Sequence, residues 1–189
     1  MHLFSAVLLG IATNLDNLTI GVMLGLQNKK VSILTNLCIS FISVLTGFLF
    51  CFLAFLFTDL GNWVSYLGGG VLIFIGIFTL LPKREKEKGI IDGIIENENS
   101  DKKHKSLSFK ESIVVALILA INCAPTSFGA GMAGMNAIIS ALFIGVFSFV
   151  AIALGSYIGR ASKTKINGKL LEWIAALLMI GIGIIEIIT

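Results

Sequence analysis

Two short polar runs lie inside apolar stretches of this chain, and their oxygen atoms are ligands of the kind that hard cations prefer. The first run covers residues 13–19 (TNLDNLT) and the second covers residues 122–127 (NCAPTS). Carboxylate, amide, hydroxyl and main-chain carbonyl oxygens bind Mg²⁺, Ca²⁺ and Mn²⁺ in proteins. The two runs therefore predict a single metal site with six candidate ligands. These are Asp16, Asn14, Asn17, Asn122, Thr126 and Ser127.

Asp16 has the most unusual position of the six. It lies near the middle of an apolar stretch, where a carboxylate costs about 2.5–3.5 kcal/mol on insertion scales. Acids at that depth usually mark ion or proton pathways, so cation binding and proton carriage both stay open for Asp16. The neutral side chains are less decisive, because Asn17, Thr19 and Ser127 taken singly could equally join helices by hydrogen bonds.

Pro125 gives the second run a further property. Proline removes an amide donor and frees a carbonyl one turn earlier, and the glycines that follow, Gly129, Gly131 and Gly134, weaken a helix further. We expect the helix to break here. A break at mid-membrane is tolerated only inside protein or beside a water cavity, and it would supply carbonyl ligands.

Six apolar stretches must position these runs. We place them at residues 3–26, 33–57, 62–81, 110–134, 137–159 and 169–188. Each could cross about 30 Å of hydrocarbon as a helix. Lipid offers no partners to an open backbone, and the alternation of a barrel strand is absent. The predicted fold class is therefore all-α, a polytopic membrane protein with six transmembrane helices.

The basic residues are sorted by the gaps between these stretches. All fourteen Lys and Arg residues fall in the first, third and fifth gaps or, for Lys110 and Lys169, at the residue that borders such a gap, and the second and fourth gaps hold none. Odd gaps share one side of a membrane when every stretch crosses it. The positive-inside rule makes that side cytoplasmic, so we expect a multi-pass cell membrane protein with both termini outside.

Composition agrees with this class and excludes others. The chain is 56% hydrophobic and 13% charged, whereas about a quarter of a typical soluble domain is charged. The predicted partner is the lipid bilayer, and a net charge of +3 gives no case for nucleic acid. Cys38, Cys51 and Cys123 are predicted to be small core residues. Both histidines lie outside the stretches, and Asp16 is the one central acid, so we predict neither an enzyme nor a cofactor.

The two halves of the chain look like repeats. A shift of 108 residues brings Asn14 onto Asn122 and Gly21 onto Gly129, and a shift of 107 brings the run 75–77 (IGI) onto 182–184 (IGI). Three stretches per half is an odd number, so the second half enters from the opposite side, as in many secondary transporters. We therefore predict two inverted three-helix repeats, 1–81 and 110–189, joined by a charged cytoplasmic loop at 82–109.

Two further features have open interpretations. Glu186, near the outer end of the last stretch, is expected to reach the membrane interface, with a place on an exit path as the alternative. Gly21 and Gly25 form a small-residue pair that predicts close helix packing, either within the fold or at the seam of a homodimer.

Several of these motifs resemble those of one family, the manganese efflux pumps (MntP). The resemblance rests on the run 14–21 (NLDNLTIG), the basic turn at 29–30 and the polar, glycine-containing segment 122–134, and the closer match is to a sporulation-associated membrane branch called YtaF. It implies export of a divalent metal, most simply Mn²⁺, with Asp16 as the acid of the first motif. In the pumps the second motif carries an acid too, and here Ala124 stands at that position.

Two functions follow. The first is a secondary cation transporter that uses Asp16 and the neutral oxygens as ligands and takes its energy from an ion gradient or the membrane potential, because no nucleotide-binding motif is present. The second is a non-transporting membrane scaffold used in spore formation, with the charged loop as its docking surface. The absence of an acid at Ala124 supports the second.

Overall fold

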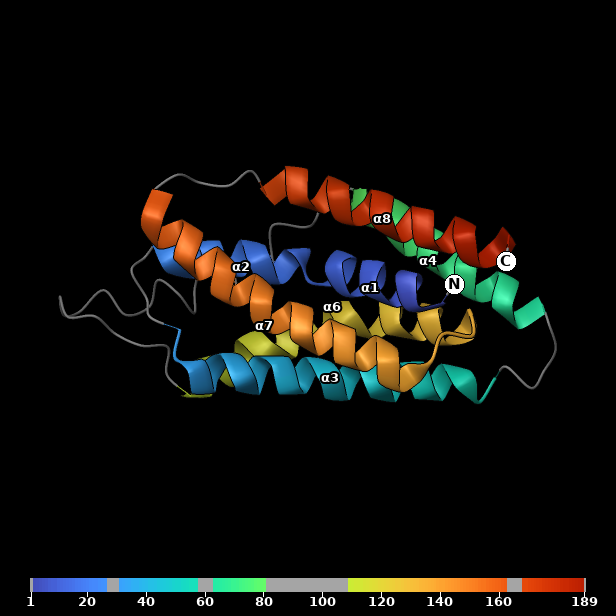
Figure 1. Cartoon of the computed structure of the whole chain (residues 1–189), viewed down its shortest axis with the longest axis horizontal. Coiled ribbons are helices and arrows are strands. Elements are labelled where there is room, and N and C mark those ends of the chain that lie inside the picture. Colours follow the sequence, from blue (N-terminus) through green and yellow to red (C-terminus); the bar gives the residue numbers. More distant parts are fainter. Residues whose placement is uncertain (1, 27–30, 58–62, 81–108, 163–167, 189) are drawn as a thin grey trace.

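The described part of the chain is helical throughout and contains no strand. A computed structural model describes residues 2–26, 31–57, 63–80, 109–162 and 168–188 (Figure 1). The helices are α1 (His2–Thr13), α2 (Leu15–Leu26), α3 (Ile33–Phe55), α4 (Trp63–Leu80), α6 (Phe109–Met132), α7 (Ala137–Ser162) and α8 (Gly168–Ile188). The predicted all-α polytopic class is confirmed. The charged segment up to residue 108 lies outside the described residues.

Five of the six predicted stretches are long and apolar enough to cross a bilayer. They are Leu3–Leu26, Ile33–Phe55, Ser112–Met132, Ala137–Ala161 and Leu170–Ile188. The first of them is built from α1 and α2 together. The predicted stretch 62–81 forms α4, whose 18 residues span about 27 Å, slightly less than the hydrocarbon thickness.

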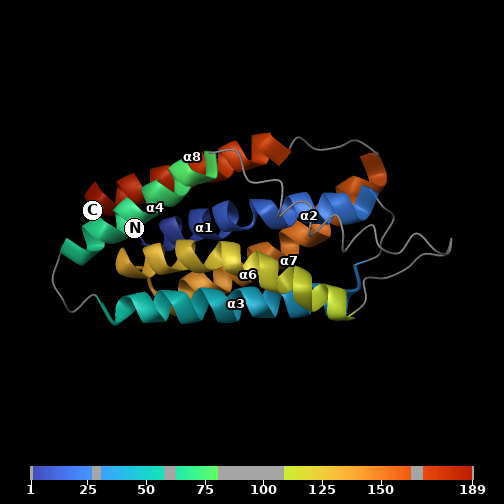
Figure 2. The same ribbon diagram turned by 180° about the vertical axis from the view of Figure 1, so that it is seen from behind.

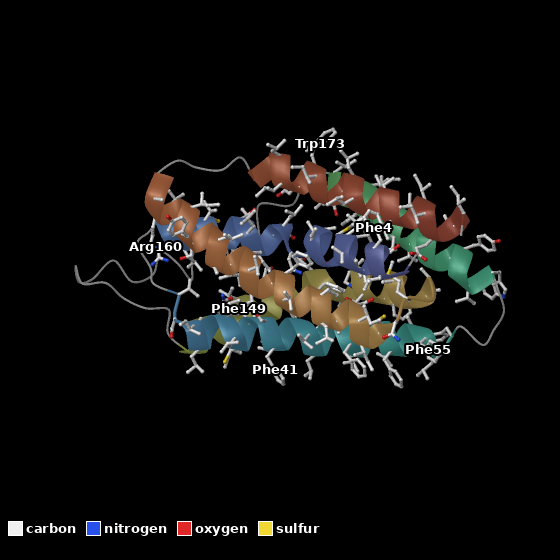
Figure 3. The ribbon with its side chains drawn as sticks, viewed as in Figure 1. Phe4, Phe41, Phe55, Phe149, Arg160 and Trp173 are labelled. Atoms are coloured by element: carbon white, nitrogen blue, oxygen red, sulfur yellow. The ribbon has the colours of Figure 1, made fainter. Side chains whose placement is uncertain are left out.

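The distribution of side chains is the reverse of that in a water-soluble bundle. Large apolar side chains cover the outside, and Phe41 and Trp173 point away from the helices with 66% and 57% of their surface exposed (Figure 3). The polar side chains of Asn14, Asn17 and Ser148 are buried instead. Lipid solvates an apolar exterior, and buried polar groups hydrogen-bond one another, so this arrangement fits a bilayer.

The most extensive helix packing joins the two halves of the chain. Helix α2 packs on α7, α3 packs on α6, and α4 packs on α8, as both views show (Figures 1 and 2). At the first of these seams a Cβ atom on Gly25 would lie 2.4 Å from the carbonyl oxygen of Ser156, and Gly21 similarly meets the main chain of Ile152. The small-residue pair therefore packs within the fold, and a homodimer stays a prediction.

Both chain termini lie at one end of the bundle (Figure 1). Helix α3 ends and α4 begins at that same end, whereas Arg160, in the last turn of α7, lies at the opposite end (Figure 3). This arrangement agrees with the predicted alternation of gaps between two faces. Which face is cytoplasmic stays a prediction.

The turn between α6 and α7 is built from two local signals. Gly134 has a φ of 81°, a left-handed conformation that glycine adopts without steric cost, and Met135 N–H donates to the carbonyl of Ala130. The side chain of Asn136 then accepts hydrogen bonds from the N–H groups of Ile138 and Ile139. This cap starts α7, because the first amides of a helix lack partners within it.

Candidate functional site

The first membrane span is interrupted at Asn14, between α1 and α2. The main-chain N–H of Asn14 donates to Ile11 rather than one residue further back, and its Nδ2 atom donates to the carbonyl of Gly10 at 2.7 Å. The side chain thus takes the carbonyl that the main chain would have bonded in a continuous helix. The carbonyl of Asn14 in turn accepts from Leu18, so one residue closes α1 and opens α2.

The expected break at Pro125 is wrong. Helix α6 runs without interruption from Phe109 to Met132 with Pro125 inside it. The proline ring lies on the exposed side of the helix, where it displaces no packing neighbour. Gly129 and Gly131 do not loosen the helix either: a Cβ atom on Gly131 would lie 2.3 Å from the carbonyl oxygen of Cys51, so this glycine admits close contact with α3.

The two polar runs meet at Asp16 and Asn122. The Nδ2 atom of Asn122, in the middle of α6, donates to the Oδ2 atom of Asp16 at 3.4 Å. Asp16 lies in the first turn of α2, where the positive end of the helix dipole favours a negative charge. Both side chains are half-buried. The structure therefore brings together a carboxylate and an amide from the two halves of the chain, as the sequence predicted.

Asn14 and Asn17 belong to a separate buried network. Asn17 donates through Nδ2 to Asn14 Oδ1 at 2.6 Å and to Ser148 Oγ at 2.8 Å. Asn14 also donates to the carbonyl of Ile144 at 3.0 Å, and Ser148 lies 3.3 Å from Ser43. Both the Nδ2 and the Oδ1 atoms of Asn14 are hydrogen-bonded to other protein atoms. We therefore assign Asn14 to holding the break in the helix rather than to binding an ion. For Asn17, both amide hydrogens are used and Oδ1 is the atom that could face a ligand.

Thr126 and Ser127 lie one turn beyond Asn122 and are completely buried. The hydroxyl of Ser127 lies 3.3 Å from the sulfur of Cys123. In the described part of the chain the hydroxyl of Thr126 has no hydrogen-bond partner, although a buried polar atom without one carries a cost of about 1–3 kcal/mol. Thr126 is therefore the predicted residue whose oxygen is most in need of a ligand.

A stripe of residues on α7 was not predicted. Serine and isoleucine alternate at every fourth position, and all of these side chains are buried: Ser140, Ile144, Ser148, Ile152 and Ser156. Residues four apart share a helix face, so the serines form a polar ladder along the inside of the bundle. The spacing is legible in the sequence, but serine is too common at membrane helix contacts for the pattern alone to indicate a site.

Two apolar clusters lie on either side of the Asp16–Asn122 pair. The cluster toward the end that holds Arg160 includes Ile20 and Leu119, and the cluster toward the chain termini includes Leu9 and Cys123. Asp16 lies between Leu9 and Ile20 along its span, and Asn122 lies between the other two residues. The candidate site thus lies between two clusters of buried apolar side chains.

Glu186 is buried inside the bundle, and its position at the membrane interface stays a prediction. Only 7% of its surface is exposed. It continues the buried face of α8 that Ala175, Met179 and Ile182 form, and this spacing of three or four residues turns Glu186 toward the inside of the bundle.

The donor set is poor in charge. Within the described ranges no three side chains among His, Cys, Asp and Glu are close enough to hold a metal ion together. The three cysteines are free thiols; Cys51 and Cys123 are buried, as predicted for core residues, whereas Cys38 is half-buried. A cation at this place would have one carboxylate, from Asp16, and otherwise neutral amide and hydroxyl oxygens. Such ligands suit a hard cation that keeps part of its hydration shell.

Comparison with protein families identifies a match. The model of a family described as "Putative manganese efflux pump" matches residues 88–187, which include α6, α7 and nearly all of α8. No solved structure matches the chain. The match begins at residue 88, so it covers Asn122 and Glu186 but not Asp16.

Proposed function

The chain belongs to the manganese efflux pump (MntP) family, and from this premise we propose that it exports Mn²⁺ by a secondary mechanism through a site at Asp16 and Asn122. The family and the apolar helices make it a multi-pass membrane protein of a transporter family rather than of an enzyme family. The observation that carries the proposed site is the 3.4 Å contact between Asp16 and Asn122, which come from different halves of the chain. The place of the chain in the sporulation-associated branch stays a prediction.

Asp16 supplies the charge that draws a cation into the bundle. Its side chain lies in the first turn of α2, where the helix dipole favours a negative charge, and helix breaks at membrane depth are where transporters bind ions. Rotation of the Asn122 amide by half a turn presents Oδ1 in place of Nδ2. Asn17 and Thr126 contribute further neutral oxygens, and the buried hydroxyl of Ser127 lies next to Thr126 in the chain.

The single carboxylate sets how tightly the ion is held. Divalent ions bind most strongly where several carboxylates surround them, and Ala124 offers none at the position where pumps of the family carry a second acid. A half-hydrated ion held by Asp16 and neutral oxygens binds weakly and leaves readily. Weak binding suits a transporter, because the ion has to be released on the far side.

Many secondary transporters are built from two related halves, and the glycine contacts support an inverted repeat in this chain. Gly76 of α4 lies against the carbonyl oxygen of Ala176 and the side chain of Ile180. Gly183 of α8 meets the same atoms in its partner helix, the carbonyl oxygen of Gly69 and the side chain of Ile73. The 107-residue shift that relates the two IGI runs exchanges these two sets of contacts.

The helix pairs, rather than the halves, are the bodies that move in this proposal. Since α2 with α7, α3 with α6 and α4 with α8 each combine both halves, rocking one half against the other would separate every one of these seams. The two apolar clusters on either side of Asp16 act as gates that open in turn.

The test is manganese accumulation in cells that express the wild type or Asp16→Asn at equal membrane levels. Wild type should lower cell manganese, and Asp16→Asn should not, because it removes the one charge of the site without changing its shape. Thr79→Ala is the control, since among the described residues the hydroxyl of Thr79 donates to the carbonyl of Ile75 in its own helix, α4. If the wild type changes neither Mn²⁺ nor any other divalent ion, the transport proposal is wrong and the scaffold function becomes the leading alternative.

A further inference from the structure

Burying a carboxylate inside a membrane bundle costs free energy, and polar groups near Glu186 could offset that cost. Glu186 is only 7% exposed, and it lies two residues before the end of α8. Burying an acid at such a place is costly unless the acid serves an ion path or a network. The site described above does not include Glu186.

Helix directions place two serines at the level of Glu186. Leu9 of α1, Ile144 of α7 and Ile182 of α8 belong to one apolar cluster. Helices α1 and α7 start at the end that holds the termini, and α8 finishes there (Figure 1). One turn from each cluster residue toward that end stand Ser5, Ser140 and Glu186.

The hydroxyls at this level lack hydrogen-bond partners. Ser5 and Ser140 are completely buried, and neither hydroxyl has a partner within the described ranges. A third such hydroxyl, on Thr126, lies one turn from Asn122 in the same direction, because α6 also runs toward the termini. Buried hydroxyls without partners are rare in folded proteins and point to a ligand or a water that passes them.

We propose that Glu186, with the hydroxyls of Ser5 and Ser140, forms a second cation site between Asp16 and the end of the bundle that holds the termini. The proposal rests on the proposed export function. The cation leaves Asp16, passes the hydroxyl of Thr126 and reaches Glu186 before release. Carboxylate and hydroxyl oxygens are ligands of a hard divalent cation, so this site takes the same ion. The apolar cluster between the two carboxylates is the gate that separates them.

The test uses the purified full-length protein in lipid vesicles that contain a fluorescent divalent indicator, with Mn²⁺ as the probe. Glu186→Gln should lower the maximal transport rate by about tenfold while the half-saturating Mn²⁺ concentration at Asp16 stays unchanged, since binding and release are separate steps. Glu186→Asp should recover most of the rate. Glu172→Gln, a half-buried acid near the other end of α8, is the matched control and should transport like wild type.

The outcomes separate this proposal from the function on which it rests. If wild type transports Mn²⁺ and Glu186→Gln transports at the same rate, the second site is wrong and the export function stands. If wild type moves no Mn²⁺, both fall together. Should Glu186→Gln fail to fold, the double change Ser5→Ala and Ser140→Ala decides: a lower rate supports the site, and an unchanged rate overturns it.

Discussion

Asn122 faces Asp16 across the bundle with 3.4 Å between the amide nitrogen and the carboxylate oxygen, although 106 positions separate the two residues. The contact joins the first turn of α2 to the middle of α6, where an interrupted span meets a continuous one. One charge and one neutral amide therefore occupy a place at which a dication would bind more tightly between two charges. The first prediction tests this directly.

Asn122→Asp should tighten Mn²⁺ binding by about tenfold, which is about 1.4 kcal/mol, because a second carboxylate then lies beside the ion. Tighter binding need not mean faster export, and we expect slower release of Mn²⁺ with a lower maximal transport rate. Ala124→Asp is the matched comparison: it restores the acid that the family pattern carries, two residues away from the contact. Mn²⁺ titration followed by electron paramagnetic resonance measures both affinities. Equal affinity in Asn122→Asp and wild type would remove Asn122 from the site.

The seam between α2 and α7 predicts a steric effect on stability. Gly25→Ala would place its new methyl 2.4 Å from the carbonyl oxygen of Ser156, so the two helices must separate. We expect a loss of about 1–3 kcal/mol and a lower melting temperature in detergent. Gly70→Ala is the control, because a Cβ atom at Gly70 meets nothing within 4 Å. Equal melting temperatures for the two variants would contradict the seam.

The break in the first span depends on Asn14. Asn14→Ala removes the side-chain hydrogen bonds to Gly10, Ile144 and Asn17. Hydrogen bonds between membrane helices contribute about 0.6 kcal/mol each on average, so the loss should be about 1–2 kcal/mol. Transport should also fall, because α2 would no longer hold Asp16 in place. Thermal unfolding and vesicle flux measure the two effects, and a variant that keeps both would show that Asn14 does not position the break.

Much of this arrangement was accessible from the sequence, because a bilayer imposes simple rules. Apolar length predicted the spans, and one buried acid beside a second polar run predicted the pair Asp16 and Asn122. The lipid leaves few places where such groups can go, so the two polar runs had to meet inside the bundle.

The sequence misled where packing decides the outcome. Proline is a helix breaker by its local chemistry, yet Pro125 sits in a continuous helix, and the break falls at Asn14, whose amide reaches the carbonyl of Gly10. The place of Glu186 near a helix end did not indicate that its side chain faces the inside of the bundle. Its burial follows from the face of α8 on which it lies and from the helices that cover that face, which a single span does not reveal.

The orientation in the membrane gives a further prediction from the two ends of α3. Ser32 precedes α3 and makes no side-chain cap, and Phe57 follows it at the end that holds the termini. In a background with Cys38, Cys51 and Cys123 replaced by alanine, Phe57→Cys should react with a membrane-impermeant thiol reagent in intact cells. Ser32→Cys should react only after the cells are permeabilised. The reverse pattern would put the basic gaps outside, against the positive-inside rule.

The seams between α2 and α7, α3 and α6, and α4 and α8 also bear on how the protein is made. Helices α2, α3 and α4 are synthesised before α6, α7 and α8, which they pack against. The first half therefore enters the bilayer before its most extensive helix contacts can form. Until then, Asp16 and the helix faces that carry Gly21 and Gly25 lack the helices that cover them in the folded protein. The seam between α4 and α8 forms only after α8, which follows the other described helices in the chain, has been synthesised.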